Sequence, residues 1–543
     1  MIRSKLMVAA AAIGLLGTAA AAQTVKTPQG ALRGITEGRS EAFKNIPFAA
    51  PPVGPLRWKP PQPAKGWSGV RDATRFGPVC MQSPIAPNMG DESAVGFALG
   101  DQGPMPQSED CLNLNVRRPA GTKASAKLPV MIWIYGGGFV FGGGSQRTYT
   151  GSGLVRNGVV LVTLNYRLDA FGFLAHPELS AEDPHHSSGN YAMLDAVAAM
   201  KWVKANIAAF GGDPNNVTLF GESAGAVSVG VLTGSPLTKG LFNRTIFESG
   251  LLFGVPDYGK GGISPGASRE VTLAGAEQEG SRWLKQSGAA SIADARKLKP
   301  EQVLAATLPG PGRPPFAFRP NIDGWFLPRS TFEQLKAGVY SKPVIAGSNN
   351  DEGVLFLWDP QFPLAQYQGM IRQTWGPFAD KMLAAYPATN DTEALHAARN
   401  TLRDSWMGVP PYVWAKHQRG APVYLYNFDH RPPFPKNPRF DDALAPHAVE
   451  LPYVFGEMFS PVMAWNKDDA AISDLMTHYW TNFAKTGNPN GKALPRWSPA
   501  SEASMQSLHF GKDNAAMGEL SSLENLKMLD AYYEEARAAA PGK

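Results

Sequence analysis

The chain has 543 residues, of which 51 are Lys or Arg and 46 are Asp or Glu, and its formal net charge is +5 at pH 7. No long run of one sign occurs, so the composition gives no case for binding nucleic acid or an anionic membrane surface. A chain of this length that is 43% hydrophobic can bury a large core.

The N-terminus has the pattern of a secretory signal. The basic segment Met1–Lys5 precedes the apolar run Leu6–Ala19, which is too short to span a membrane with ease, and Ala20–Ala22 supply an A-x-A cleavage site. We therefore expect residues 1–22 to be a signal peptide and residues 23–543 to form a single domain. The mature protein is expected to be periplasmic or secreted, with no stable membrane insertion after cleavage.

Two features of the N-terminal part follow from residue type. Phe43–Trp58 is rich in Pro, so we expect extended chain lying over the fold and not a helix or central strand. Cys80 and Cys111 are the two cysteines of the chain, and in an exported protein two cysteines favour one disulfide. The polar segment between the cysteines is expected on the rim of the fold.

Predicted strands and helices alternate through the rest of the chain. Apolar runs predict strands at Val130–Tyr135, Val159–Leu164, Val217–Phe220, Val344–Gly347 and Val423–Phe428, and helical periodicity is found at about 192–210, 472–484 and 522–539. Residues 255–320 change composition and are interpreted as an excursion from the sheet, not as a separate domain. Such alternation predicts an α/β fold whose large, mostly parallel sheet is covered by helices on both faces.

A candidate nucleophile lies at the end of the Val217–Phe220 strand. Residues 221–225 fit the pattern G-x-S-x-G, and a helix-compatible run follows, which is the layout of a nucleophile elbow with Ser223 at its apex. The pattern occurs again at Gly262–Gly266, but no strand precedes that copy. Pro265 there has no N–H group to donate, so we interpret Ser264 as a loop serine.

Three consecutive glycines, Gly136–Gly138, follow the Val130–Tyr135 strand. They could turn backbone N–H groups toward a ligand without steric cost, or they could form a simple flexible turn. Ligand sites in parallel sheets lie beyond the carboxyl ends of strands. Because the glycines and Ser223 both follow strands, they could converge on one site.

A serine nucleophile needs a base and an acid, in the chain order Ser, acid, His for this type of fold. His396, His417 and His478 lie in helical patterns and His509 in a short strand-like run, which leaves His430 and His447 in loops. Spacing does not choose between these two histidines. Position likewise leaves Asp351 and Glu352 open as the acid, since both follow the Val344–Gly347 strand.

The chain resembles the type-B carboxylesterases, the α/β-hydrolase family that includes cholinesterases and bacterial para-nitrobenzyl esterases. The segments that carry the resemblance are Phe43–Trp58, Glu109–Asn113, Tyr135–Phe139, Asn165–Leu168, Phe210–Pro214, Gly221–Gly225 and Asn482–Pro489. The resemblance implies an α/β-hydrolase fold and a serine hydrolase that cleaves carboxylic esters through an acyl-enzyme intermediate.

The resemblance also implies roles for individual residues. Ser223 would be the nucleophile, Glu352 the acid and His447 the base. The oxyanion hole would consist of the N–H groups of Gly137, Gly138 and Ala224. A Cys80–Cys111 disulfide and an ion pair between Arg57 and Glu109 are implied as well.

The expected partner is a small-molecule or apolar ester, with no cofactor, no metal and no nucleic acid, and the sequence indicates no oligomeric state. Residues 81–110 contain no Trp, whereas cholinesterases use a Trp in this loop to bind choline, which speaks against choline esters. Two alternatives are a non-catalytic adhesion or scaffold protein, and a hydrolase of amides or thioesters on the same site.

Overall fold

The computed structural model describes residues 21–82, 96, 99–100, 102–103, 105–250, 252–253, 256–257, 270–308, 317–357, 361–436, 441–511 and 514–539. Residues 1–20, with most of the predicted signal peptide, and residues 262–266, with Ser264, lie outside the described residues. Among the helices described, none has the length and apolarity needed to cross a membrane.

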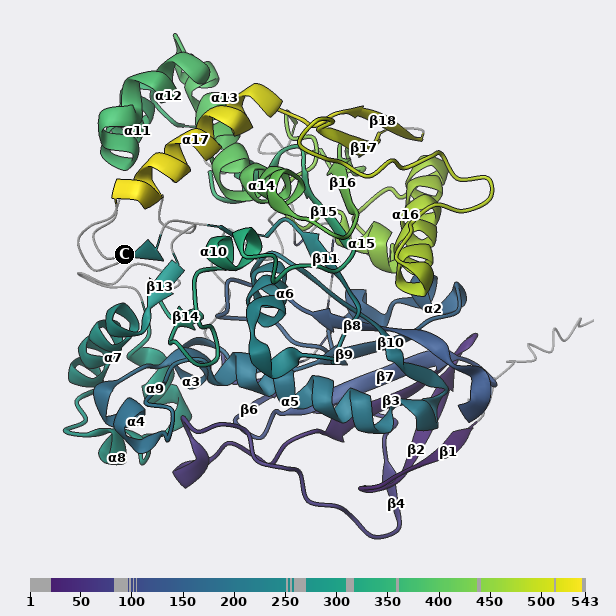
Figure 1. Cartoon of the computed structure of the whole chain (residues 1–543). Helices are drawn as coiled ribbons and strands as arrows, with labels where there is room; N and C mark the ends of the chain where they lie inside the picture. Colours follow the sequence, from purple (N-terminus) through teal and green to yellow (C-terminus); the bar gives the residue numbers. More distant parts are fainter. Residues whose placement is uncertain are drawn as a thin grey trace, which may run out of the picture.

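A 13-stranded sheet runs through the molecule (Figure 1). Its order is β1-β2-β3-β7-β9-β8-β10-β11-β15-β16-β17-β18, and β4 pairs with β2. All neighbours from β9 to β17 are parallel, as predicted, whereas the remaining neighbours are antiparallel apart from β4, which lies parallel to β2. The strands are β1 Ala21–Thr27, β2 Gly30–Glu37, β3 Ser40–Pro47, β4 Val70–Asp72, β7 Asn113–Pro119, β8 Leu128–Ile134, β9 Val160–Leu164, β10 Gly212–Glu222, β11 Arg244–Glu248, β15 Val344–Asn349, β16 Val423–Phe428, β17 Gln506–Phe510 and β18 Ala515–Glu519.

The central strands are mostly apolar because helices cover them and leave their residues buried. Every residue of β9 and of β16 is buried, and so is every residue of β11 except Arg244. Helices α5 and α6 pack against β10, and α16 packs against β8 and β10. The helices are α2 Ser152–Arg156, α3 Asp169–Phe173, α4 Pro177–Glu182, α5 Tyr191–Asn206, α6 Ala224–Gly234, α7 Leu273–Ser287, α8 Ile292–Ala295, α9 Pro300–Ala305, α10 Thr331–Lys336, α11 Leu364–Trp375, α12 Ala379–Ala385, α13 Asp391–Leu402, α14 Val409–His417, α15 Leu451–Phe455, α16 Lys467–Thr486 and α17 Leu523–Ala539.

The expectation for Phe43–Trp58 is wrong in its first part. Residues up to Pro47 belong to β3, which pairs with β2 on one side and with β7 on the other. The prolines begin only at Pro47, so the preceding residues keep the N–H groups that a sheet requires. The remainder is irregular chain with one short 3-10 helix, η1 Gly54–Leu56.

The excursion predicted over residues 255–320 contains helices and a small sheet. Strands β12 Pro256–Asp257, β13 Glu270–Thr272 and β14 Asn321–Ile322 form that sheet, and α7, α8 and α9 follow β13 (Figure 1). Trp283 of α7 packs edge-on against Trp58, with ring centroids 5.5 Å apart. The excursion is thereby tied to the N-terminal part of the chain.

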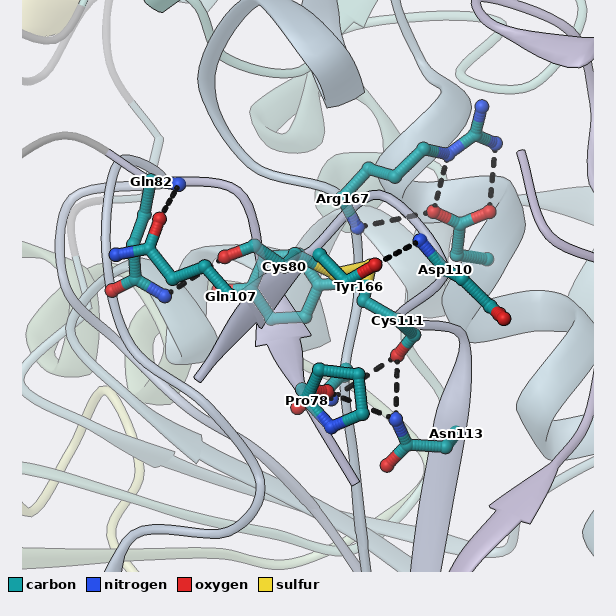
Figure 2. Close-up of a disulfide and its surroundings, with 12 residues drawn as sticks. Pro78, Cys80, Gln82, Gln107, Asp110, Cys111, Asn113, Tyr166 and Arg167 are labelled. Carbon is teal, nitrogen blue, oxygen red and sulfur yellow. Dashed lines mark hydrogen bonds and ion pairs between the residues drawn. A yellow bond between two sulfur atoms is a disulfide. The ribbon is translucent and has the colours of Figure 1, made fainter. Parts of the chain in front are cut away.

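Cys80 and Cys111 form a disulfide beside two short paired strands, β5 Val79–Cys80 and β6 Gln107–Ser108 (Figure 2). The ion pair that the resemblance implies is also present. The Arg57 guanidinium donates to both carboxylate oxygens of Glu109, at 2.7 Å from Nε and 2.5 Å from Nη2. Arg57 also donates to the carbonyl of Leu298 at 2.8 Å, so one side chain links the disulfide region to the excursion.

Candidate active site

Ser223 occupies a strained turn between β10 and α6. Its backbone has φ 57° and ψ −125°, a region that residues with a side chain rarely adopt. A Cβ atom on Gly221 would lie 2.6 Å from the Gly225 carbonyl carbon, and one on Gly225 would lie 2.0 Å from the carbonyl oxygen of Ile134. The two glycines are therefore required by the close approach of strand and helix, as a nucleophile elbow demands.

The triple glycine converges on the same turn. A Cβ on Gly136 would lie 2.7 Å from Glu222 Oε2 and 3.0 Å from the Ser223 Cβ atom. Gly137 and Gly138 have φ of 94° and 61°. Among the residues that the structure describes, none accepts a hydrogen bond from the N–H of Gly137 or Gly138. These two donors are thus free beside the serine, and Ala224, the first residue of α6, lies at a helix N-terminus.

Glu352 and His447 lie in direct contact. Glu352 opens a short 3-10 helix, η8 Glu352–Leu355, directly after β15, and His447 lies in the loop before α15. The His447 Nδ1 atom is 2.5 Å from Glu352 Oε2, and both side chains are buried. The other carboxylate oxygen of Glu352 accepts from the Ser249 hydroxyl at 2.5 Å and from the Asn349 N–H at 2.7 Å.

The loops that carry the acid and the histidine are hydrogen-bonded to each other. The Asn349 side chain donates to the Pro446 carbonyl at 2.9 Å, and the Asp351 N–H donates to the Ala445 carbonyl at 3.0 Å. The Asp351 carboxylate accepts from the Leu444 N–H at 3.2 Å. Of the two acids that the sequence left open, Glu352 thus reaches the histidine, and Asp351 braces the loop.

His430, the other loop histidine, lies in a separate polar cluster. Its Nε2 atom is 2.7 Å from Asp469 Oδ1, which also accepts from the Tyr453 hydroxyl at 2.7 Å. His430 is buried and its ring packs edge-on against Tyr453. The structure therefore brings His447, and not His430, to Glu352.

Glu222 is a further side chain at this site, and sequence reasoning did not select it. Its Oε1 atom lies 3.0 Å from His447 Nε2. The contact has ion-pair distance without hydrogen-bond geometry, because this buried oxygen has no hydrogen-bond partner within the described chain. A carboxylate directly after a buried apolar strand was the sequence signal that could have identified it.

The charges around His447 control its protonation. Burial lowers the pKa of His447, but the carboxylates of Glu222 and Glu352 outweigh burial and raise the pKa to about 9. Burial in turn raises the pKa of Glu222 well above its ordinary range. Because the two groups are in contact, they titrate together and not as independent sites.

Two more buried carboxyl groups surround this pair. Burial and the neighbouring Glu352 raise the pKa of Glu450 to about 7, and Glu450 accepts from the Asn349 side chain. Glu248, whose pKa is raised by burial, accepts from the Trp480 indole N–H at 2.7 Å. Glu248 and Glu450 each lie within an apolar stretch of the sequence, and this is the signal that could have revealed them.

An aromatic surface lies next to His447. The ring of Phe356, which is partly buried, is 5.6 Å from the His447 ring and 4.9 Å from the ring of Trp406, centroid to centroid. Trp406 belongs to η10 Arg403–Gly408, a stretch of π-helix. An apolar group bound beside the histidine would contact these rings.

In the described part of the chain, one group of side chains has metal-ligating atoms close together. These atoms belong to His417, Asp530 and Glu534 and lie within 4.8 Å of one another. The ammonium of Lys416 lies 2.6 Å from Asp530 and 3.4 Å from Glu534. The lysine ammonium already pairs with both carboxylates where a cation would lie, so we assign no metal to this group.

Comparison with known proteins gives a consistent picture. The model of the Carboxylesterase family matches residues 21–528. Fumonisin B1 esterase of Sphingopyxis macrogoltabida is 36% identical over 498 residues, covering 89% of this chain and 86% of that protein. Liver carboxylesterase 1 of Mus musculus is 36% identical over 494 residues, covering 84% of this chain and 82% of that protein. A solved structure of a PNB esterase is 32% identical with a TM-score of 0.77, covering 93% of this chain and 99% of that chain.

Proposed function

Because the chain belongs to the carboxylesterase family and is a carboxylic ester hydrolase, we propose that it acts through an acyl-enzyme intermediate on Ser223. His447 is the general base and Glu352 the acid that orients it. The observation that carries the proposal is the buried 2.5 Å contact between His447 Nδ1 and Glu352 Oε2. The other ring nitrogen of His447 lies 3.0 Å from the carboxylate of Glu222, which directly precedes Ser223 in its strained elbow.

In the first half of the reaction, His447 Nε2 takes the Ser223 proton as the hydroxyl oxygen attacks the ester carbonyl carbon. The carbonyl oxygen becomes an oxyanion, which the N–H groups of Gly137, Gly138 and Ala224 stabilise, each donor typically being worth about 3–4 kcal/mol of barrier. His447 then gives its proton to the leaving alcohol, and the acyl group remains on Ser223.

In the second half, His447 takes a proton from water, which attacks the acyl carbonyl carbon. Collapse of the second tetrahedral intermediate releases the carboxylic acid and returns the proton to Ser223. Glu352 holds the imidazole in the tautomer whose Nδ1–H points at its carboxylate, and its charge stabilises the imidazolium formed in each step.

We propose small, apolar esters as substrates. The aromatic surface of Phe356 and Trp406 next to His447 supports an apolar group on the substrate. Hydrolysis of para-nitrophenyl esters from acetate to palmitate, with Ser223→Ala as the control, tests both the site and the chain length. An optimum at short chains that disappears in Ser223→Ala is the expected result.

Three outcomes would replace this proposal. Full activity in Ser223→Ala would remove the serine from the mechanism. A wild-type protein that neither turns over these esters nor becomes labelled by a fluorophosphonate would point to a scaffold, while faster turnover of matched thioesters or amides than of esters would change the substrate class.

We also propose that the protein is exported. The signal-like N-terminus and the Cys80–Cys111 disulfide support an oxidising compartment. Mass spectrometry of the protein recovered outside the cytoplasm should give an N-terminus at Gln23, and recovery of the intact chain from the cytoplasm alone would contradict export.

A further inference from the structure

Gln82 forms a two-way hydrogen-bonded pair with the backbone of Gly142. The Gln82 amide donates from Nε2 to the Gly142 carbonyl at 3.0 Å, and its Oε1 accepts from the Gly142 N–H at 2.9 Å. Nε2 also donates to the carbonyl of Cys80 at 3.0 Å, and the side chain is buried. Both N–H donors of the amide are thus used in joining Cys80 of the disulfide to Gly142.

Gly142 lies near the end of the loop of residues 136–144, which we call the glycine loop. A Cβ on Gly142, whose φ is 119°, would lie 3.2 Å from the Gly136 carbonyl oxygen, and one on Gly137 would lie 2.3 Å from the Phe141 carbonyl oxygen. Gly137 itself accepts from the N–H of Val140 at 3.0 Å. The end of the loop therefore packs directly on Gly136, which lies next to Ser223, and on Gly137.

Cys111, the other cysteine of the disulfide, is connected to the same loop at Gly144. Asn165 accepts from the Gly144 N–H at 2.9 Å and donates to the carbonyl of Cys111 at 3.1 Å. One cysteine is thus connected to Gly142 through Gln82, and its disulfide partner to Gly144 through Asn165. Figure 2 shows Gln82 and Gln107 beside the two joined cysteines.

From this arrangement we propose that Gln82 is a positioning residue for the oxyanion hole. The proposal rests on the proposed function, in which Gly137 and Gly138 donate to the oxyanion. Gln82 touches no reacting atom; it holds Gly142, which sets where the two glycine N–H groups point. Oxyanion donors act only if they meet the position that the oxyanion reaches, so a loosened loop weakens transition-state binding more than substrate binding.

The test compares three variants on para-nitrophenyl acetate. Gln82→Met keeps the side-chain volume and removes both hydrogen bonds to Gly142. Gln82→Glu keeps the acceptor for the Gly142 N–H and loses the donor. Gln107→Met is the matched control. The Gln107 side chain accepts a hydrogen bond from the Gln82 backbone N–H at 3.0 Å, and within the described part of the chain it makes no hydrogen bond to the glycine loop.

We expect Gln82→Met to lower kcat by about tenfold to a hundredfold, the range for a small misplacement of catalytic groups, with KM nearly unchanged. Its affinity for a trifluoromethyl ketone, which forms a tetrahedral adduct with the serine, should fall by the same factor. Gln82→Glu, which puts a buried carboxylate against the Gly142 and Cys80 carbonyl oxygens, should lose at least as much as Gln82→Met, and Gln107→Met should match the wild type in both measurements.

Other outcomes would overturn the assignment. A fall in thermal stability with kcat and ketone affinity unchanged, measured well below the unfolding temperature, would make Gln82 merely structural. A higher KM at constant kcat would show that Gln82 affects substrate binding and does not position the oxyanion hole. If Ser223→Ala retains activity, the proposed function fails; if Ser223→Ala is inactive while Gln82→Met is fully active, the positioning role alone fails.

Discussion

His447 contacts a buried carboxylate at each ring nitrogen. The contact of Nδ1 with Glu352, at 2.5 Å, orients the ring, whereas the contact of Nε2 with Glu222, at 3.0 Å, lies on the side where the base must act. Both charges favour the protonated imidazolium form of His447. They therefore stabilise the tetrahedral intermediates in the proposed mechanism, but they also keep His447 of the free enzyme protonated to a higher pH. If His447 is the base, as we propose, these charges stabilise the transition state and lower the activity at low pH.

The first prediction concerns the choice of histidine. His447→Ala should lower kcat by at least about a thousandfold, because it removes the proton acceptor of Ser223. His430→Ala removes a side chain that is paired with Asp469, so it should lower the free energy of unfolding and leave kcat within about tenfold of the wild type. Steady-state kinetics and urea denaturation of both variants separate the effects, and equal losses of kcat would refute the assignment of the base.

The second prediction concerns pH. The Glu222 carboxylate raises the pKa of His447, and His447 must be neutral to accept a proton, so activity increases as pH rises through that pKa. Glu222→Gln removes the charge and should move the acidic limb of the kcat/KM profile to lower pH, by roughly one unit. Glu248→Gln, which changes a buried carboxyl group bonded to Trp480, should leave the limb in place. A limb that moves to higher pH in Glu222→Gln would show that the sign is wrong.

His509 adds side-chain contacts to the backbone pairing between β16 and the hairpin of β17 and β18. His509 of β17 lies 2.6 Å from the Asp429 carboxylate at the end of β16 and 2.8 Å from the Glu519 carbonyl of β18. Ser507, His509 and Asp429 have the residue types of a triad, but Ser507 is fully buried and donates to Asn427 at 2.8 Å. The set therefore stabilises the edge of the sheet.

The third prediction follows from this contact. The hydrogen bond to Asp429 raises the pKa of His509 above that of the unfolded chain. A raised pKa gives stability that is fully present below the unfolded pKa, about 6.5, and is lost as pH rises through the folded value. His509→Gln should thus lower the free energy of unfolding more at pH 5.5 than at pH 9, as measured by urea denaturation. In an Asp429→Asn background the same substitution should lose most of this pH dependence, and an equal cost at both pH values in the wild-type background would contradict the assignment.

Segments far apart in the chain meet at the active site because parallel strands place their carboxyl ends at one edge. The glycines follow β8, Ser223 follows β10 and Glu352 follows β15, while His447 arrives from the loop before α15. On the N-terminal side, the disulfide and the Arg57–Glu109 pair fasten irregular chain to this framework. The precision of the site therefore depends on long-range connections as well as on the sheet.

The fourth prediction is that the disulfide stabilises the fold appreciably. The two cysteines are 31 residues apart in sequence. Closing a loop of that length should contribute about 3–4 kcal/mol to the free energy of unfolding by restricting the unfolded chain. The double variant Cys80→Ser/Cys111→Ser, compared with the oxidised wild type in urea denaturation, measures the difference. A change below about 1 kcal/mol would show that the loop is already ordered in the unfolded state.

The sequence by itself determined the elements whose signal is local. Apolar runs identified β8, β9, β10, β15 and β16, and the glycines around Ser223 identified the elbow, because close backbone approach permits no other residue. The antiparallel strands were harder: β3 was hidden by the prolines that follow it, and antiparallel strands have weaker apolar patterns than buried parallel ones.

Residue spacing left open which polar side chains meet; the family resemblance implied Glu352 and His447, and the tertiary structure brings those two into contact. Spacing could not choose between His430 and His447, or between Asp351 and Glu352, because a loop places its side chains through contacts with distant segments. The positions of Glu222, Glu450 and Gln82 beside the site likewise depend on packing. Local residue patterns encode strands and turns, whereas proximity between loops arises only when the sheet has assembled.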